Sequence, residues 1–165
     1  SQTEHRNLEF KAAARSFSMD NALEYCAGIA NARGGLLVLG VNNDRAVVGT
    51  AAFPDPRVLE LRAHERLGIA ILVREVRDKD RRVLVIQIPS RQQGMPIELE
   101  GRYWLRTGES LVRMSPNQLG EIYAESQGRP VVRVASDNHH ADQVAELLDI
   151  DAYFQLMDQP QPSDL

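Results

Sequence analysis

The fold of this chain is decided by residues 27–41, which read AGIANARGGLLVLGV. Apolar residues between Leu23 and Ala30 recur on one helical stripe, and Ser18 is a suitable N-cap for that helix. We expect the helix to end at Gly34-Gly35, because the residue after a helix commonly needs a positive φ. Residues 36–41 contain no polar side chain, so they predict a central strand that is buried on both faces.

The flanking sequence extends this helix and strand into an α+β pattern. Residues 8–12 alternate between apolar and charged side chains, which is typical of a half-buried strand. In the helix predicted at 58–67, we expect Val58, Leu61 and Leu67 to face inward. Residues 77–82 are all charged and predict a solvated hairpin tip. The remaining expected elements are strands at 46–49, 69–76, 83–88, 97–100 and 103–105 and a helix that Ser115 caps.

The predicted fold class is α+β, with a mixed, mainly antiparallel sheet flanked by helices. We expect one domain over residues 1–125. The sequence becomes polar and contains Pro and Gly at 126–138, and residues 126–158 predict an appendage with one short strand and one or two helices. Residues 159–165, rich in Gln and Pro, predict a disordered tail.

Composition places this 165-residue chain among ordinary globular proteins, with 43% hydrophobic and 25% charged residues. A single cysteine, Cys26, excludes an internal disulfide and fits a reducing compartment. The longest apolar run is about six residues, far below the roughly 20 that span a bilayer. With no secretory signal pattern either, we expect a cytoplasmic protein that does not enter a membrane.

The formal net charge of −4 is unevenly distributed. Residues 127–165 contain two arginines and seven acidic residues, a balance of 2 − 7 = −5, which leaves +1 for residues 1–126. A nearly neutral domain can still carry a local phosphate-binding patch, so the total charge does not decide for or against nucleic acid.

Four motifs, in this order and spacing, resemble the Schlafen-type Alba-like domain, which older nomenclature calls a divergent AAA-type domain. They are Glu4 with Glu9-Phe10-Lys11, the helix end Ile29 to Gly35, Leu39-Gly40-Val41 with its Asn/Asp-rich turn and Val48-Gly49, and Tyr103 to Ser110. The resemblance covers roughly residues 4–125. It implies association with nucleic acid and, as in some members, a divalent-metal-dependent endoribonuclease that acts on structured RNA such as tRNA.

In those members two Glu and one Asp form the acidic site, and Glu4 and Glu9 match the two Glu positions. The Asp position is held here by Asn43, with Asp44 one residue later. The resemblance therefore implies Glu4, Glu9, Asn43 and Asp44 as candidate ligands of Mg²⁺ or Mn²⁺, and Glu4, Glu9, Lys11 and Asp44 as candidate catalytic residues. Five residues on a regular strand place Glu4 and Glu9 on opposite faces, so their convergence requires a bend near residues 5–7.

Lys11 lies two residues from Glu9 on the same strand face, where it could neutralise a phosphate oxygen. Two simpler interpretations stay open: Glu9 and Lys11 can form a solvated ion pair, and Asn42 to Asp44 can serve only as a turn. Candidate phosphate contacts, chosen because guanidinium groups bind phosphate bidentately, are Arg33, Arg45, Arg102, Arg106 and Arg113, with Arg106 the preferred one.

Other kinds of site lack their motifs. The sequence contains no GxxxxGK[ST] phosphate loop, so nothing in it supports ATP hydrolysis. His139-His140 has no zinc-site spacing, and Cys26 on the apolar helix stripe is expected to be inert core.

Three hypotheses follow. The first is a metal-dependent endoribonuclease. The second is a non-catalytic RNA- or DNA-binding module, for example of a transcriptional regulator; our preference is nucleic-acid binding with endoribonuclease activity left open. The third is a homodimerisation module whose terminal helices exchange between subunits.

Overall fold

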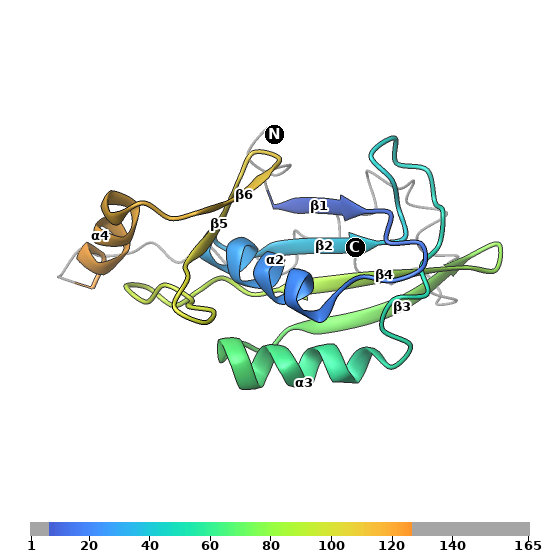
Figure 1. The fold of residues 1–165 in the computed structure, drawn as a ribbon, viewed down its shortest axis with the longest axis horizontal. Coiled ribbons are helices and arrows are strands. Elements are labelled where there is room, and N and C mark those ends of the chain that lie inside the picture. Colours follow the sequence, from blue (N-terminus) through green and yellow to red (C-terminus); the bar gives the residue numbers. More distant parts are fainter. Residues whose placement is uncertain (1–6, 127–165) are drawn as a thin grey trace, which may run out of the picture.

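The computed structural model describes residues 7–126. Within this range the chain forms six strands and three helices (Figure 1). In chain order they are β1 (Leu8–Lys11), α2 (Met19–Asn31), β2 (Gly35–Leu39), α3 (Pro56–Leu67), β3 (Leu72–Asp78), β4 (Arg81–Ile88), β5 (Trp104–Thr107), β6 (Ser110–Arg113) and α4 (Pro116–Ala124).

The main sheet has the strand order β1-β2-β4-β3. β1 pairs with β2 in parallel, whereas β2 with β4 and β3 with β4 are antiparallel. β2 is central and all five of its residues are buried, as predicted. A separate β5-β6 hairpin packs against α2. The predicted α+β class with a mainly antiparallel sheet is confirmed.

The segment from α2 to β2 forms as its sequence indicates. The Ser18 side chain accepts a hydrogen bond from the backbone N–H of Asn21 and caps the helix. The helix ends through two residues with positive φ, Arg33 at 77° and Gly34 at 87°. Gly35 is required for a different reason: a Cβ there would lie 2.1 Å from the carbonyl oxygen of Asn7. The turn between helix and strand therefore has no room for a side chain at this position.

The prediction for the buried face of α3 was wrong in part. Val58 and Leu61 are 45% and 56% exposed, whereas Leu59, Ala63 and Leu67 are buried. These three residues recur every four positions and so share one face of the helix. The small side chain of Ala63 had hidden this stripe in the sequence.

Two predicted strands are reduced to single bridges. Residues 46–49 contribute only the bridge between Val41 and Val47, and residues 97–100 only the bridge between Leu99 and Arg102. The partner of β5 is instead β6, a strand that the sequence analysis did not assign. The 69–88 hairpin is confirmed, although its strands extend through most of the charged segment, so that only Lys79 and Asp80 form the tip.

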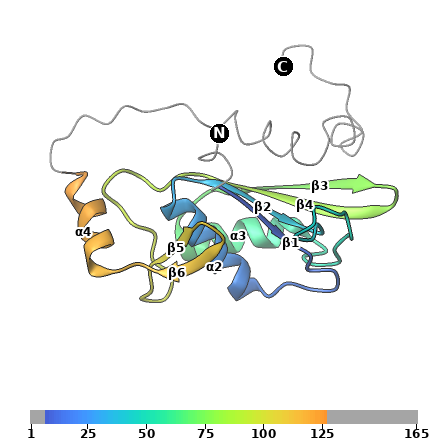
Figure 2. The same ribbon diagram turned by 90° about the horizontal axis from the view of Figure 1, so that it is seen from above.

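Both helices that contact the main sheet lie on one of its faces (Figures 1 and 2). The larger apolar cluster lies between them and includes Leu23 and Ile29 of α2, Leu59 of α3, and Leu37 and Ile86 of the sheet. This arrangement places the β5-β6 hairpin beside α2 and near the buried side of β1.

Glu4, the tail predicted at 159–165 and, apart from Ser126, the appendage predicted at 126–158 lie outside the described residues, and the boundary predicted at residue 125 stays a prediction. Among residues 7–126, no helix combines the length and the hydrophobicity needed to cross a bilayer.

Candidate nucleic-acid interface

Glu9 lies at the centre of a polar cluster between the sheet and β5. It is in register with Leu37 of β2, so it points to the face of the sheet that α2 covers. Arg106 of β5 donates from Nε to Glu9 Oε2 at 2.8 Å and from Nη2 to the carbonyl oxygen of Leu8 at 2.7 Å. The side chains of Arg106 and Glu9 are only 4% and 10% exposed. This is a buried ion pair that joins two strands 97 residues apart.

The sequence predicts Arg106 as a phosphate contact, but the structure uses its guanidinium differently. Nε and Nη2 hold Glu9 and Leu8, and Nη1 is buried without a hydrogen-bond partner in the described part of the chain. In this conformation Arg106 contacts Glu9 from the buried side and does not reach the surface.

Lys11 is the accessible cation of the cluster. Its Nζ lies 3.4 Å from Glu9 Oε1, and 35% of its side chain is exposed. The same Nζ lies 4.9 Å from the ring centroid of Tyr25 on α2, a cation–π distance. Burial lowers the pKa of Lys11, but hydrogen bonding and charge interactions with Tyr25 and Glu9 outweigh burial and raise the pKa above its ordinary value. Lys11 is therefore fully cationic at neutral pH.

Tyr25 and Phe17 add an aromatic component that the sequence analysis missed. Both rings are half-buried, and their centroids lie 6.2 Å apart at an interplanar angle of 44°. Neither residue belongs to a local motif. Only the register of β1 against α2 brings Tyr25 to Lys11, so the sequence carried no signal for it.

Two contacts hold β5 in the place from which Arg106 reaches Glu9. The Nδ2 of Asn31, at the end of α2, donates to the carbonyl oxygens of Trp104 at 2.7 Å and of Ile97 at 3.0 Å. In the last turn of α2, Gly28 faces β5-β6 so closely that a Cβ there would lie 2.3 Å from Leu111 Cδ1 and 3.3 Å from the backbone nitrogen of Arg106.

The turn after β2 starts at the same edge of the sheet as the end of β1, since the N–H of Gly40 donates to the carbonyl oxygen of Lys11 at 2.8 Å. Asn42 Oδ1 accepts hydrogen bonds from the backbone N–H groups of Asp44 and Ala46, so its side chain builds the turn. Asn43, Asp44 and Arg45 are exposed. Within residues 7–126, no hydrogen bond or ion pair joins this turn to Glu9.

A metal ion of the Mg²⁺ type needs several oxygen ligands, preferably charged. No three His, Cys, Asp or Glu side chains come together in residues 7–126. Both oxygens of Glu9 already face cations, Arg106 and Lys11. The described residues therefore do not fit a metal by themselves, and a site would need Glu4 and the displacement of Lys11.

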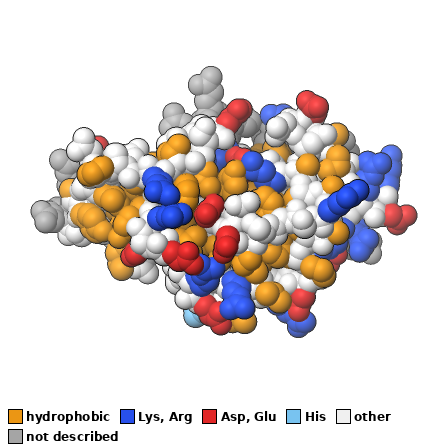
Figure 3. Space-filling view, viewed as in Figure 1, with side chains coloured by type: hydrophobic (Ala, Val, Ile, Leu, Met, Phe, Trp, Pro, Cys, Tyr) orange, Lys and Arg blue, Asp and Glu red, His pale blue; other side chains and the backbone are white. Residues whose placement is uncertain are grey.

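The other candidate arginines are dispersed. Arg33 is exposed and pairs with Glu125 at 3.4 Å, and the Arg113 guanidinium lies 5.6 Å from the ring centroid of Trp104. Arg102 is exposed in the turn before β5. On the face of the molecule seen in Figure 1, acidic and basic side chains are intermixed, with Lys and Arg most frequent toward the end of the β3-β4 hairpin (Figure 3). The exposed cations of that hairpin are Arg74, Arg77, Lys79 and Arg81.

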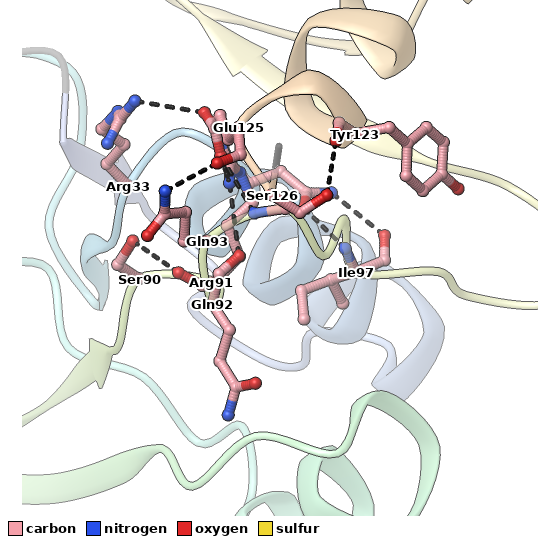
Figure 4. A network of polar contacts seen from close by, with 11 residues as sticks. Arg33, Ser90, Arg91, Gln92, Gln93, Ile97, Tyr123, Glu125 and Ser126 are labelled. Carbon is pink, nitrogen blue, oxygen red and sulfur yellow. Dashed lines mark hydrogen bonds and ion pairs between the residues drawn. The ribbon is translucent and has the colours of Figure 1, made fainter. Parts of the chain in front are cut away.

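A second polar network fixes α4 and was not anticipated (Figure 4). Arg91 forms a bidentate pair with Glu125, with Nη1–Oε1 and Nη2–Oε2 distances of 2.6 and 2.8 Å. The backbone N–H of Gly94 also donates to Glu125. The hydrogen bonds from Arg91 outweigh burial and, with Gly94 and Arg33, lower the pKa of Glu125 to about 2. Because these groups tie α4 to the loop after β4, the network is structural.

Comparison with known proteins yields one family. The family model described as Schlafen, AlbA_2 matches residues 4–115, more than half of the chain. No curated protein matches this chain. The crystal structure of the DIP2311 protein from Corynebacterium diphtheriae is 22% identical with a TM-score of 0.59, and the match covers 76% of this chain and 28% of that one.

A solution NMR structure from Nitrosomonas europaea is 18% identical with a TM-score of 0.41, over 83% of this chain and 88% of that one. It is the N-terminal domain of a protein described as related to the ATP-dependent DNA helicase RecG. At these identities, the likeness to the Corynebacterium protein shows a shared fold.

Proposed function

Since this chain belongs to the Schlafen AlbA_2 family, which suggests association with nucleic acid, we propose that it binds RNA through the surface around Lys11 and Tyr25. The observation that carries this proposal is the geometry of Lys11: its side chain is 35% exposed, and its ammonium is held between the Glu9 carboxylate and the Tyr25 ring. Proteins that bind single-stranded nucleic acids combine positioned cations, which contact phosphates, with aromatic rings, on which bases stack.

Glu9 and Arg106 act as positioning residues in this proposal. Glu9 fixes the Lys11 ammonium, and Arg106 fixes Glu9 from the buried side. A lysine side chain loses rotamer entropy when it binds a phosphate, and part of this cost is already met when the ammonium is held before binding. The cluster is thus a preorganised cation rather than an isolated surface lysine.

The test is fluorescence anisotropy of a labelled single-stranded RNA, a tRNA-like hairpin and a single-stranded DNA, each titrated at several salt concentrations. Lys11→Gln should weaken RNA binding. It should also make the negative slope of log K against log[salt] less steep by about 0.7, the contribution of one phosphate contact in single strands. Arg62→Gln is the matched control, because it also removes one cation, from an exposed i,i+3 pair on α3.

Equal binding by the wild type and the Lys11 variant would show that this surface is not the binding site. Failure of the wild type to bind any of the three ligands would remove the proposed function itself. Tighter binding to the DNA than to either RNA would assign the surface to DNA instead.

Metal-dependent endoribonuclease activity is a second candidate, favoured by the placement of Glu9, a family-matched carboxylate, 3.4 Å from a cationic lysine. Because the described residues do not hold a metal by themselves, this candidate depends on Glu4. With Mg²⁺ or Mn²⁺ supplied, a nuclease should cleave the tRNA-like hairpin and should lose that cleavage in Glu4→Gln. Undiminished cleavage in Glu4→Gln, or none by the wild type with either ion, would count against it. Homodimer formation and a cytoplasmic location stay predictions.

A further inference from the structure

The second face of the main sheet carries an apolar cluster of its own. Its centre is formed by Leu36 and Val38 of β2 and Val83 and Val85 of β4. Leu8 and Phe10 of β1 and Val76 of β3 extend it to both edges. All four strands therefore present hydrophobic side chains on the face opposite to Glu9.

No helix among residues 7–126 contributes to this cluster. The buried residues of α2 and α3 pack in the other cluster, and both helices lie on the other side of the sheet (Figure 2). An apolar sheet face is stable only when a second layer of structure removes it from water. Within residues 7–126 only Val41 and Val47, beside the turn after β2, add to the four strands in this cluster, so the rest of the layer is expected from residues outside 7–126 or from another chain.

We propose that the C-terminal segment 139–158 of the same chain is this layer. The N-terminal alternative, residues 1–6, reads SQTEHR and has no large apolar side chain to contribute. In contrast, Val144, Leu147 and Leu148 have the three- and four-residue spacing of an amphipathic helix, and Tyr153, Phe154, Leu156 and Met157 continue the apolar character.

The dimensions agree with this assignment. Four strands about 4.8 Å apart make a face roughly 15–20 Å wide, which two helices about 10 Å across can cover. The twelve residues 127–138 can extend about 40 Å. A domain of 120 residues is on the order of 35 Å in diameter, so the connection from the end of α4 reaches any part of the face.

Charge complements the hydrophobic match. Residues 139–158 contain five Asp and Glu residues and no Lys or Arg. On the sheet face, the exposed Arg74 of β3 is in register with Val85 and shares its side of the sheet. An acidic amphipathic segment on this face therefore meets a cation at its edge.

Photocrosslinking of the full chain tests the proposal. A benzophenone maleimide is attached to Arg74→Cys, at an exposed position on the proposed docking face, and to Arg62→Cys on α3 as the control on the opposite side. Background labelling is low because Cys26 is buried and burial raises the pKa of its thiol to about 12. The crosslinked peptides are then mapped by mass spectrometry.

We expect intramolecular crosslinks from position 74 to residues 139–158 and none from position 62. Leu147→Asp with Leu148→Asp should abolish them, whereas Gln143→Asp, which adds charge at a polar position, should not. Crosslinks between two chains would assign the face to a second copy and overturn the proposal. Crosslinks from position 74 that avoid residues 139–158 would overturn it as well.

Discussion

Replacing Glu9 with glutamine removes the negative charge that faces the buried Arg106 guanidinium. The amide oxygen of glutamine can still accept the hydrogen bond from Arg106 Nε, so the change is close to isosteric. It leaves a cation that is 4% exposed, with Nη1 already lacking a hydrogen-bond partner in residues 7–126. Glu9→Gln therefore tests the electrostatic role of the pair with little change in packing.

The expected cost is large because an unpaired charge remains buried. Removal of one partner of a buried ion pair destabilises proteins by roughly 3–5 kcal/mol, a substantial part of a total stability of about 5–15 kcal/mol. Lys11→Gln provides the comparison on the same carboxylate. Lys11 is partly exposed and Glu9 keeps Arg106 after its removal, so we expect a loss below about 1 kcal/mol.

Urea unfolding followed by far-UV circular dichroism measures these differences through the transition midpoint at constant m-value. Glu9→Gln with Arg106→Met removes both charges and should recover part of the loss, since the buried cation is gone. A Glu9→Gln variant within about 1 kcal/mol of the wild type would show that the Glu9 charge does not stabilise the buried Arg106. So would a double variant whose loss equals the sum of the two single losses.

Two further predictions concern packing and pH. A Cβ at Gly28 would displace the end of the Leu111 side chain and lie 3.3 Å from the backbone nitrogen of Arg106, so Gly28→Ala should destabilise by about 1 kcal/mol. Gly120→Ala, in the open middle of α4, should instead stabilise by up to about 1 kcal/mol. Urea midpoints measure both changes, and equal shifts would contradict the packing difference between the two sites. The pKa of Glu125 is lowered to about 2 in the folded protein, so its contribution to stability is complete above its unfolded pKa near 4.5 and is lost as the pH falls toward 2. Between pH 4.5 and 2, Glu125→Gln should therefore lose less stability than the wild type or the control Glu121→Gln. Thermal unfolding at stepped pH measures this, and parallel curves of stability against pH would contradict the lowered pKa of Glu125.

Local patterns predicted the part of the fold that local chemistry controls. The cap at Ser18, the end of α2 near Gly34 and the wholly apolar β2 are each specified within a few residues, although the positive φ angles fall on Arg33 and Gly34 and not on the predicted pair Gly34-Gly35. The proximity of Glu9 and Lys11 followed from the period of two along a strand. At these positions sequence and structure agree because the determining interactions are short in range.

The remainder of the site depends on contacts between distant segments. Arg106 and Glu9 are 97 residues apart, and nothing near either residue indicates the other. The contact between Tyr25 and Lys11 depends on how α2 lies over β1. The α3 face was misassigned because helical phase is ambiguous when the stripe includes a residue as small as Ala63. Tertiary packing, rather than local propensity, decides such cases.

Amide chemical-shift mapping shows whether RNA contacts the surface around Lys11. A short single-stranded RNA is titrated into the ¹⁵N-labelled protein, and the perturbed amides are assigned along the chain. We expect the largest changes in residues 8–12 and 17–25, around Lys11, Phe17 and Tyr25. Changes confined to the basic β3-β4 hairpin, with none around Lys11, would contradict it.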